Sequence, residues 1–325
     1  MDKATVVLSR WLPDTFTDTL AEKFRIVRPA ENESFSREEL LAAVRGCDAI
    51  LAVGDRIDDA VCAAAAPTCR VVANFGVGYN NIDVEAATSR GIWVTNTPDV
   101  VTDATADLAW ALLLAAARRI GECDRLVRAG QWKSWGPLFM LGSDVSGTTL
   151  GIVGGGRIGL AMAKRALGFN MDILYTANAP KPDFEKATGG RFVPLATLLR
   201  EADFVSLHVP LTEQTRHLIG APELAMMKKT AVLVNTARGP VVDEKALVAA
   251  LEARAIAGAG LDVFEREPLV EPCLLKLDNV VLAPHVGSAT LQCRTGIARM
   301  ACRNILAALR SELPPNCLNP EARGK

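Results

Sequence analysis

The chain has few histidines and no paired cysteine motif. Only three of its 325 residues are histidine, so any mechanism that needs an imidazole must use His208, His217 or His285. Its eight cysteines never form a CxxC pair, and a core of this size does not require disulfides. We therefore interpret the cysteines as reduced thiols and predict no metal site.

A charge excess and a long hydrophobic run are missing as well. The 36 lysines and arginines nearly balance the 37 aspartates and glutamates, so no basic field exists for a nucleic acid backbone. The longest apolar stretch, Leu108 to Ala117, reaches about half of a bilayer span. The N-terminus shows no secretory signal. We expect a cytoplasmic protein with neither a nucleic acid nor a membrane partner.

What the sequence does contain is an alternation of short apolar runs with longer amphipathic stretches, which is typical of parallel sheets in α/β proteins. The runs of the first series are Val6–Leu8, Ile50–Val53, Val71–Ala73 and Trp93–Val94. Those of the second series are Leu150–Val153, Asp172–Tyr175, Phe204–Leu207, Val232–Asn235, Gly260–Val263 and Val280–Ala283. The pattern predicts an α/β chain with two open sheets.

The helices between and after these series indicate the domain boundaries. Residues Asp103 to Arg119 are strong helix formers and lie between the two series. A last helix, from about Ala289 to Ser311, follows the second sheet and is expected to return to the first unit. We predict one domain made of residues 1–102 and 290–325, and a second made of residues 103–289.

A glycine-rich turn follows the strand Leu150–Val153. It has the GxGxxG pattern, with Gly154, Gly156 and Gly159 at the three glycine positions and a helix from about Ile158. In this context the glycines permit the tight turn, the approach of a pyrophosphate and the packing of helix on strand. The motif predicts a dinucleotide site, although a glycine turn without a ligand is the alternative.

The end of the next strand bears on the choice of coenzyme. An acid there would bind the ribose 2′-hydroxyl of NAD and repel the 2′-phosphate of NADP. The chain has Thr176, Ala177 and Asn178 instead, with Lys181 nearby, but it also lacks the arginine that usually holds the phosphate. We expect NADP to be preferred and leave NAD open.

Three more segments carry polar residues where predicted strands end, at the edge where open α/β sheets collect ligands. Arg238 presents a fork that matches a carboxylate, and His285 can act as a general acid that Glu267 supports. Taken singly, these three could be a surface arginine, a loop acid and a structural cap. His208 has no comparable carboxylate, and His217 is interpreted as a surface helix residue.

These residues and motifs resemble the D-isomer-specific 2-hydroxyacid dehydrogenases, most closely the glyoxylate/hydroxypyruvate reductases, over nearly the whole chain. The resemblance rests on the motifs LGIVGGGRIG, ADFVSLHVPLTEQTRHLI, MKKTAVLVNTARGPVVDEKAL, GLDVFEREP and APHVGSAT. It implies that Arg238, Glu267 and His285 form a catalytic triad and that the substrate binds Gly76, Val77, Gly78, Arg238 and His285. Cofactor-binding positions are Thr105, Gly154, Gly156, Arg157, Ile158, Gly159, Asn178, Val209, Pro210, Thr215, Thr236, Ala237 and Asp262.

The same resemblance implies two doubly wound parallel-sheet domains: a Rossmann-type cofactor domain and a flavodoxin-like substrate domain. It also implies a homodimer through the cofactor domain. The expected reaction is NAD(P)H-dependent reduction of glyoxylate or hydroxypyruvate to the 2-hydroxy acid.

Other functions within and beyond this family stay open at this point. One is D-3-phosphoglycerate dehydrogenase or another D-2-hydroxyacid dehydrogenase, and the other is a dinucleotide-sensing corepressor. The chain ends about forty residues after His285, without the added regulatory domain of many phosphoglycerate dehydrogenases. The absence of a disordered or basic tail counts against the corepressor role.

Overall fold

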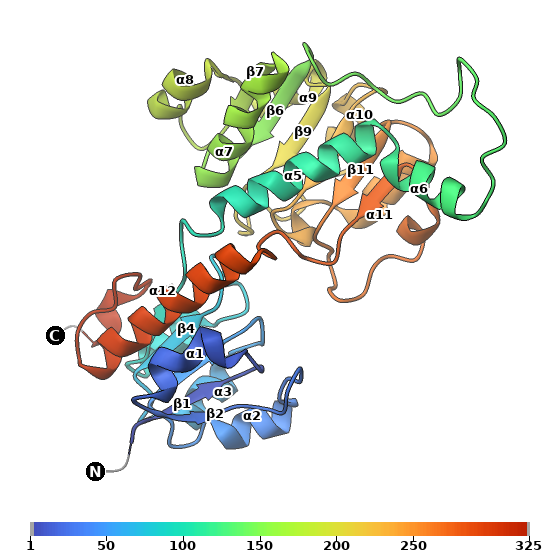
Figure 1. Cartoon of the computed structure of the whole chain (residues 1–325). Helices are drawn as coiled ribbons and strands as arrows, with labels where there is room; N and C mark the ends of the chain where they lie inside the picture. The colour runs from blue at the N-terminus through green and yellow to red at the C-terminus, as the bar shows by residue number, and fades with distance from the viewer. Residues whose placement is uncertain (1–2, 324–325) are drawn as a thin grey trace. The chain divides into compact units, whose positions relative to one another are not determined.

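The computed structural model describes residues 3–323 and divides the chain into two compact units (Figure 1). One unit consists of Met1–Val101 and Ala289–Lys325, and the other of Thr102–Ser288. Each unit contains one sheet whose strands all pair in parallel, as the alternating pattern of the sequence predicts.

The first unit has a five-stranded sheet in the order β2-β1-β3-β4-β5, the strand order of flavodoxin-like domains. Its strands are β1 (Thr5–Leu8), β2 (Arg25–Val27), β3 (Ala49–Ala52), β4 (Val71–Asn74) and β5 (Trp93–Thr95). Its helices are α1 (Asp14–Ala21), α2 (Arg37–Ala43), α3 (Asp59–Ala65), α4 (Val84–Ser89) and α12 (Leu291–Leu309). Helix α12 packs against α1 and β4, so the C-terminal helix belongs to this unit.

Side-chain caps explain where several of these helices begin. The Ser36 hydroxyl accepts a hydrogen bond from the backbone of Glu39, whose carboxylate binds the Ser36 N–H in return. Asp58 and Asp83 cap α3 and α4 in the same way, each accepting from the third residue after it. β3 and β4 are buried along their whole length, which accounts for their nearly continuous apolar sequence.

The second unit has a seven-stranded sheet in the order β12-β11-β10-β9-β6-β7-β8. Its strands are β6 (Thr149–Val153), β7 (Asp172–Thr176), β8 (Arg191–Phe192), β9 (Phe204–Leu207), β10 (Val232–Asn235), β11 (Gly258–Leu261) and β12 (Val280–Leu282). Its helices are α5 (Thr102–Ala117), α6 (Ile120–Arg128), α7 (Arg157–Ala166), α8 (Pro182–Thr188), α9 (Leu195–Glu201), α10 (Ala221–Met226) and α11 (Glu244–Glu252). This is the doubly wound order of Rossmann domains, so the predicted fold class is confirmed.

Helix α5 packs closely on the sheet of the second unit. It contacts β10, β11 and α7, and a Cβ on Gly260 of β11 would lie 2.8 Å from the Cβ of Leu112. The Trp110 ring stacks on Phe169 with 4.8 Å between centroids, while its indole N–H donates to the carbonyl of Met162. In the part of the chain that the structure describes, no helix combines the length and apolarity that crossing a membrane requires.

The strand order of this unit reverses at β6, which lies between β7 and β9. Chain connections leave β6 and β9 in opposite directions there, and ligands of open α/β sheets bind in the crevice at the carboxyl ends of the strands beside such a point. Except for Thr105 of α5, the predicted site residues of the second unit all follow the carboxyl ends of strands of this sheet.

Candidate active site

The strongest contact in the predicted catalytic set joins His285 and Glu267. His285 follows β12, with its backbone at φ +54° and its N–H donating to the carbonyl of Asp262. Its Nδ1 lies 2.7 Å from Oε2 of Glu267, whereas Oε1 of Glu267 accepts the Phe264 N–H at 3.0 Å. Since a carboxylate oxygen can only accept, Nδ1 carries a proton, and the ring as a whole is half-exposed.

The electrostatics of Glu267 keep it ionised. Burial raises the pKa of the carboxyl, but the hydrogen bonds from His285 and Phe264 and the positive charge of Arg238 outweigh this, so the net pKa is below its ordinary value of 4.5. An ionised Glu267 next to His285 stabilises the doubly protonated ring. The pair therefore combines an imidazole with the carboxylate that orients it, which is the arrangement of a general acid and its supporting anion.

Arg238 lies in the loop after β10. Asn235 fixes that loop, because its Oδ1 accepts the Ala237 N–H and its Nδ2 donates to the Arg238 carbonyl, both at 3.0 Å. Burial lowers the pKa of the Arg238 guanidinium, while the charge of Glu267 acts in the opposite direction. Nη1 donates to the Ala237 carbonyl at 2.7 Å, which sets the direction of the fork. The structure thus brings Arg238 within electrostatic reach of Glu267.

Asp262 fixes the loop that carries His285. Its two carboxylate oxygens accept the backbone N–H groups of Val286 at 2.7 Å and Gly287 at 2.8 Å, and the residue is buried. Burial raises its pKa, although these two amides lower it. Thr105 lies at the same place, since a Cβ on Gly287 would be 3.5 Å from its Oγ1. Asp262, a predicted cofactor-binding residue, is therefore also a positioning residue, with a second lone pair on each oxygen.

The glycine loop has the geometry of a phosphate cradle. Gly154 has φ +108°, and a Cβ there would lie 2.7 Å from the backbone of His208. A Cβ on Gly159 would lie 2.1 Å from the Gly154 carbonyl, so both positions require glycine. Around Gly156, by contrast, the described residues leave the Cβ direction open for 4 Å, at the N-terminus of α7 where Arg157 and Ile158 begin the helix.

A second observation, at Thr236, also agrees with a dinucleotide at this site. The Thr236 hydroxyl is buried and finds no hydrogen-bond partner within the described residues 3–323. Buried hydroxyls normally have partners, so a polar group of a ligand at this strand end would satisfy it. A nicotinamide dinucleotide bound across the topological switch could occupy the open space at Gly156 on one side. On the other side it could supply the hydrogen-bond partner of the Thr236 hydroxyl.

The loop after β9 carries three more predicted cofactor positions. Thr215 holds this loop together, because its hydroxyl donates to the Pro210 carbonyl at 2.6 Å and accepts the Thr212 N–H at 2.8 Å. Val209 packs on the core. Next to it, burial lowers the pKa of His208 to about 3, and its Nε2 lies 2.9 Å from the Ser206 hydroxyl. His208 is therefore neutral and unsuited to donate a proton.

At the end of β7, Asn178 is exposed and no acid lies between it and Thr176. Lys181 is held nearby: its backbone N–H donates to the Tyr175 hydroxyl at 2.6 Å, and its side-chain stem is 3.6 Å from where a Cβ on Gly155 would lie. The lysine therefore lies beside the glycine loop.

The predicted substrate loop belongs to the first unit. Asn74 donates from Nδ2 to the carbonyls of Gly76 and Gly78, both at 2.9 Å, and Asn96 donates to the carbonyl of Val77 at 2.8 Å. In a trans peptide the N–H of the next residue points away from the carbonyl. The N–H of Val77 therefore points away from Asn74 and that of Gly78 away from Asn96, so these two side chains do not occupy the amides that the resemblance assigns to the substrate carboxylate.

One sequence interpretation is wrong. His217 is not in a surface helix: it lies in a turn after β9, at φ +52°, and its Nε2 is 2.5 Å from Oε1 of Glu265. The prediction failed because the polar run Thr212–Arg216 before His217 is typical of an exposed helix, whereas the segment forms turns. Two further residues were not identified from the sequence: Glu265, which binds the His217 ring, and Glu244, which accepts the Glu265 N–H. Glu244 follows Asp243, which caps α11, and its carboxylate accepts the N–H groups of Glu265 and Glu271.

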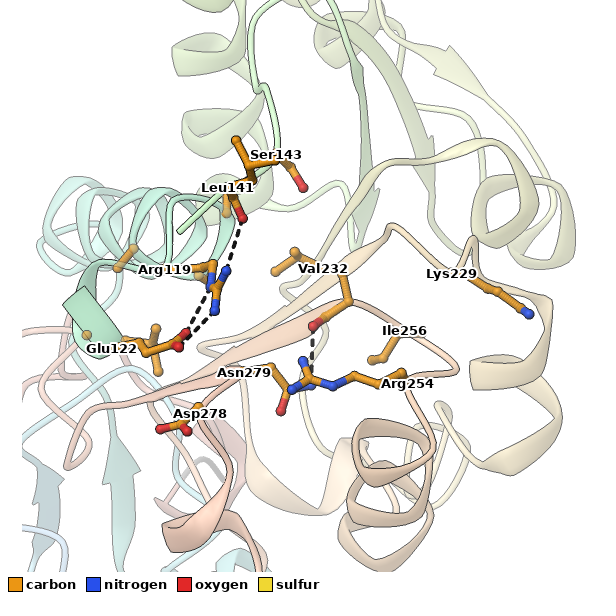
Figure 2. A pocket seen from close by; sticks show the side chains of 17 residues that line it. Arg119, Glu122, Leu141, Ser143, Lys229, Val232, Arg254, Ile256, Asp278 and Asn279 are labelled. Atoms are coloured by element: carbon orange, nitrogen blue, oxygen red, sulfur yellow. Dashed lines mark hydrogen bonds and ion pairs between the residues drawn. The ribbon is translucent and has the colours of Figure 1, made fainter. Parts of the chain in front are cut away.

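A cavity of about 490 Å³ lies elsewhere in the second unit (Figure 2). It is lined from the residues just before β10, β11 and β12, including Lys229, Arg254 and Asp278, and so lies at the opposite edge of the sheet from the predicted site. Figure 2 shows Arg119 there in a double hydrogen bond with Glu122. None of the predicted site residues lines this cavity.

Comparison with known proteins gives consistent matches. The model of the family described as "D-isomer specific 2-hydroxyacid dehydrogenase, NAD binding domain" matches residues 110–287. The glyoxylate reductase of Thermococcus onnurineus is 51% identical over 323 residues, which cover 98% of this chain and 97% of that protein.

Solved structures are similar over nearly the whole chain. The glyoxylate reductase from Paecilomyes thermophila matches with a TM-score of 0.87 and 35% identity over 98% of this chain and 99% of that one. The NADPH-dependent glyoxylate/hydroxypyruvate reductase from Sinorhizobium meliloti, in complex with NADP and malonate, matches with a TM-score of 0.84 and 33% identity, covering 99% and 98%.

Proposed function

Because the chain belongs to the D-isomer-specific 2-hydroxyacid dehydrogenase family, we propose that it reduces glyoxylate or hydroxypyruvate to the corresponding 2-hydroxy acid. The observation that carries the proposal is the His285–Glu267 contact of 2.7 Å within electrostatic reach of Arg238. A general acid, the anion that holds it and a cation for a carboxylate are the groups that reduction of a 2-keto acid requires.

Each of the three residues has a separate task. The nicotinamide coenzyme supplies the hydride that is added to C2 of the keto acid. His285 donates the proton at Nε2 to the keto oxygen, and Glu267 holds Nδ1 so that the ring keeps its orientation and charge. Arg238 binds the substrate carboxylate with its fork and draws electron density from the neighbouring keto oxygen. Gly76, Val77 and Gly78 stay the predicted substrate-binding segment of the first unit.

The coenzyme would be held by the glycine loop, by the loop of Val209, Pro210 and Thr215, and by Thr236 and Ala237. We infer that NADP is preferred over NAD. No acid lies between Thr176 and Asn178 to repel a 2′-phosphate, and the Lys181 stem lies beside the glycine loop where its ammonium can reach one. The reductase from Sinorhizobium meliloti, solved with NADP, supports this preference.

We also infer a homodimer formed through the cofactor domain. Large apolar side chains are exposed on the segment from α6 to residue 141, namely Ile120, Val127, Trp132, Trp135, Leu138, Phe139 and Leu141. Exposed apolar surface on this scale marks an interface, and a second copy is the partner that the family resemblance implies. Light scattering should give twice the 34.7 kDa of the chain, and Trp135→Asp with Leu138→Asp should shift it toward the monomer.

The test of the function is a matrix of initial rates with NADPH and NADH against glyoxylate, hydroxypyruvate and pyruvate. We expect turnover of glyoxylate or hydroxypyruvate and a higher kcat/KM with NADPH, with pyruvate as the comparison substrate. His285→Ala should lower kcat by on the order of a hundredfold or more, as loss of a general acid does. No turnover with any pair, or full turnover in His285→Ala, would overturn the assignment.

A further inference from the structure

The loop that carries Glu267 makes a second contact between a histidine and a carboxylate. Glu265 lies two residues before Glu267 in the chain, and its Oε1 is 2.5 Å from Nε2 of His217. Since a carboxylate only accepts, the His217 ring donates this bond. The two side chains remain partly exposed, at 43% for His217 and 26% for Glu265.

His217 is itself fixed to the segment that follows Arg238. Its backbone N–H donates to the Pro240 carbonyl at 2.7 Å. Two residues later, Ile219 donates to Val241 at 3.1 Å and accepts from Asp243 at 3.0 Å, a short parallel pairing. His217 thus ends the coenzyme loop after β9 and lies alongside the segment that begins with Arg238.

The catalytic loop is packed against the same segment. A Cβ on Gly239 would lie 1.9 Å from the carbonyl carbon of Phe264 and 2.5 Å from the nitrogen of Glu265, so the two backbones are in direct contact. The carboxylate of Glu244 accepts the N–H of Glu265 at 2.8 Å and that of Glu271 at 3.1 Å. Glu265 is therefore held through its backbone by Glu244 and through its side chain by His217.

From this arrangement we propose that His217 and Glu265 are positioning residues that join the coenzyme loop to the loop of Glu267. The proposal rests on the proposed function of Glu267 and His285. The contact fixes the backbone of Phe264 and Glu265, and Phe264 in turn donates to Glu267, which leaves the other oxygen of Glu267 aimed at His285. A small displacement of a catalytic group costs a large part of its effect on rate.

Folding stability does not explain this contact. Partly exposed ion pairs contribute little to the stability of the fold, because solvent screens them and two side chains must be immobilised. Removal of the His217 ring should therefore change the rate of proton donation much more than the melting temperature. That difference separates a positioning role from a structural one.

The experiment compares His217→Ala, His217→Gln, Glu265→Ala and the variant that combines His217→Ala with Glu265→Ala. We expect kcat with NADPH and glyoxylate to fall on the order of tenfold in His217→Ala, with KM and Tm nearly unchanged and the high-pH limb of kcat/KM moved to lower pH. The combined variant should resemble His217→Ala, because both changes remove the same contact. His217→Gln, whose amide can still donate to Glu265, should recover most of the activity. Arg191→Ala, which removes the exposed 3.0 Å pair with Glu201, is the matched control and should leave kcat unchanged.

A second readout does not depend on turnover. With only three histidines, the ring NMR signals of each can be assigned by single substitutions, and the titration of the His285 signals can be followed directly. We expect the midpoint of that titration to move to lower pH in His217→Ala. If the wild type reduces no keto acid, the proposed function fails but this measurement still decides the role of His217. Wild-type kcat and an unmoved His285 titration in His217→Ala, or a loss of kcat that only follows a loss of Tm, would overturn the proposal.

Discussion

Replacing Glu267 by glutamine is the perturbation that isolates its charge. Oε1 of Glu267 accepts from Phe264 at 3.0 Å and Oε2 from His285 at 2.7 Å, so both contacts need an acceptor. A glutamine keeps one acceptor and places an N–H donor where the other oxygen was. It therefore loses the negative charge and, with the nitrogen toward His285, can no longer accept from a protonated Nδ1. The neutral side chain keeps the volume, so packing is preserved.

The size of the effect follows from the bond that is lost. A hydrogen bond to a charged partner stabilises by about 1.5–3 kcal/mol, and a shift of one pH unit corresponds to about 1.36 kcal/mol. The high-pH limb of kcat/KM for glyoxylate reduction should therefore move down by about one to two pH units, and activity at pH values above the wild-type limb should fall about 10- to 100-fold.

The assay is the initial rate of NADPH oxidation from about pH 5 to pH 9, with coenzyme dissociation constants measured alongside. Glu201→Gln, which removes the charge of an exposed pair on α9, is the control and should reproduce the wild-type profile. A Glu267→Gln variant whose profile coincides with that of the wild type would refute the reasoning.

Three other expectations concern Arg238, Gly239 and the acid stability of the fold. Arg238→Lys loses a bidentate contact of about 1.5–3 kcal/mol, so KM for the keto acid should rise by about 10- to 100-fold with a smaller change in kcat; an unchanged KM would remove Arg238 from the site. Gly239→Ala would place a Cβ 1.9 Å from the backbone of Phe264, and calorimetry should show a Tm lower by several degrees together with loss of turnover; wild-type values in that variant would contradict the close contact. The lowered pKa of Glu267 means that its ionised form stabilises the fold fully above its ordinary value of 4.5, and that this stabilisation is lost as pH falls through the lower pKa of the folded state. Urea unfolding should show that the difference in free energy of unfolding between the wild type and Glu267→Gln decreases below pH 4.5. A difference that does not change with pH would contradict this.

The strands and the glycine turn could be predicted because their causes are local. Buried parallel strands leave apolar runs such as Val232–Asn235, and a turn that brings Gly154 to φ +108° leaves a glycine that can be recognised in one sequence. Parallel strands also place their carboxyl ends on one edge, which is why Arg238, Asp262 and His285 could be assigned to one region without coordinates.

The outer contacts of the site could not be predicted because they depend on the path of loops. His217 has a positive φ, which a histidine rarely adopts, and nothing in its neighbourhood along the chain indicates the distant Glu265. Gly239 looks like any glycine in a loop until the backbone of Phe264 is found against it. The roles of the catalytic, cofactor and substrate residues stay predictions, which the rate and titration measurements test.

The most direct test of the central claim follows the hydride itself. NADPH that carries deuterium on the reactive face of the nicotinamide is mixed with glyoxylate and enzyme in a single turnover, and the product is analysed by mass spectrometry and rapid quench. The account predicts glycolate with deuterium at C2, formed on the order of a hundredfold or more slowly in His285→Ala while that variant binds NADPH as the wild type does. Glycolate without deuterium, or an equal rate in His285→Ala, would contradict it.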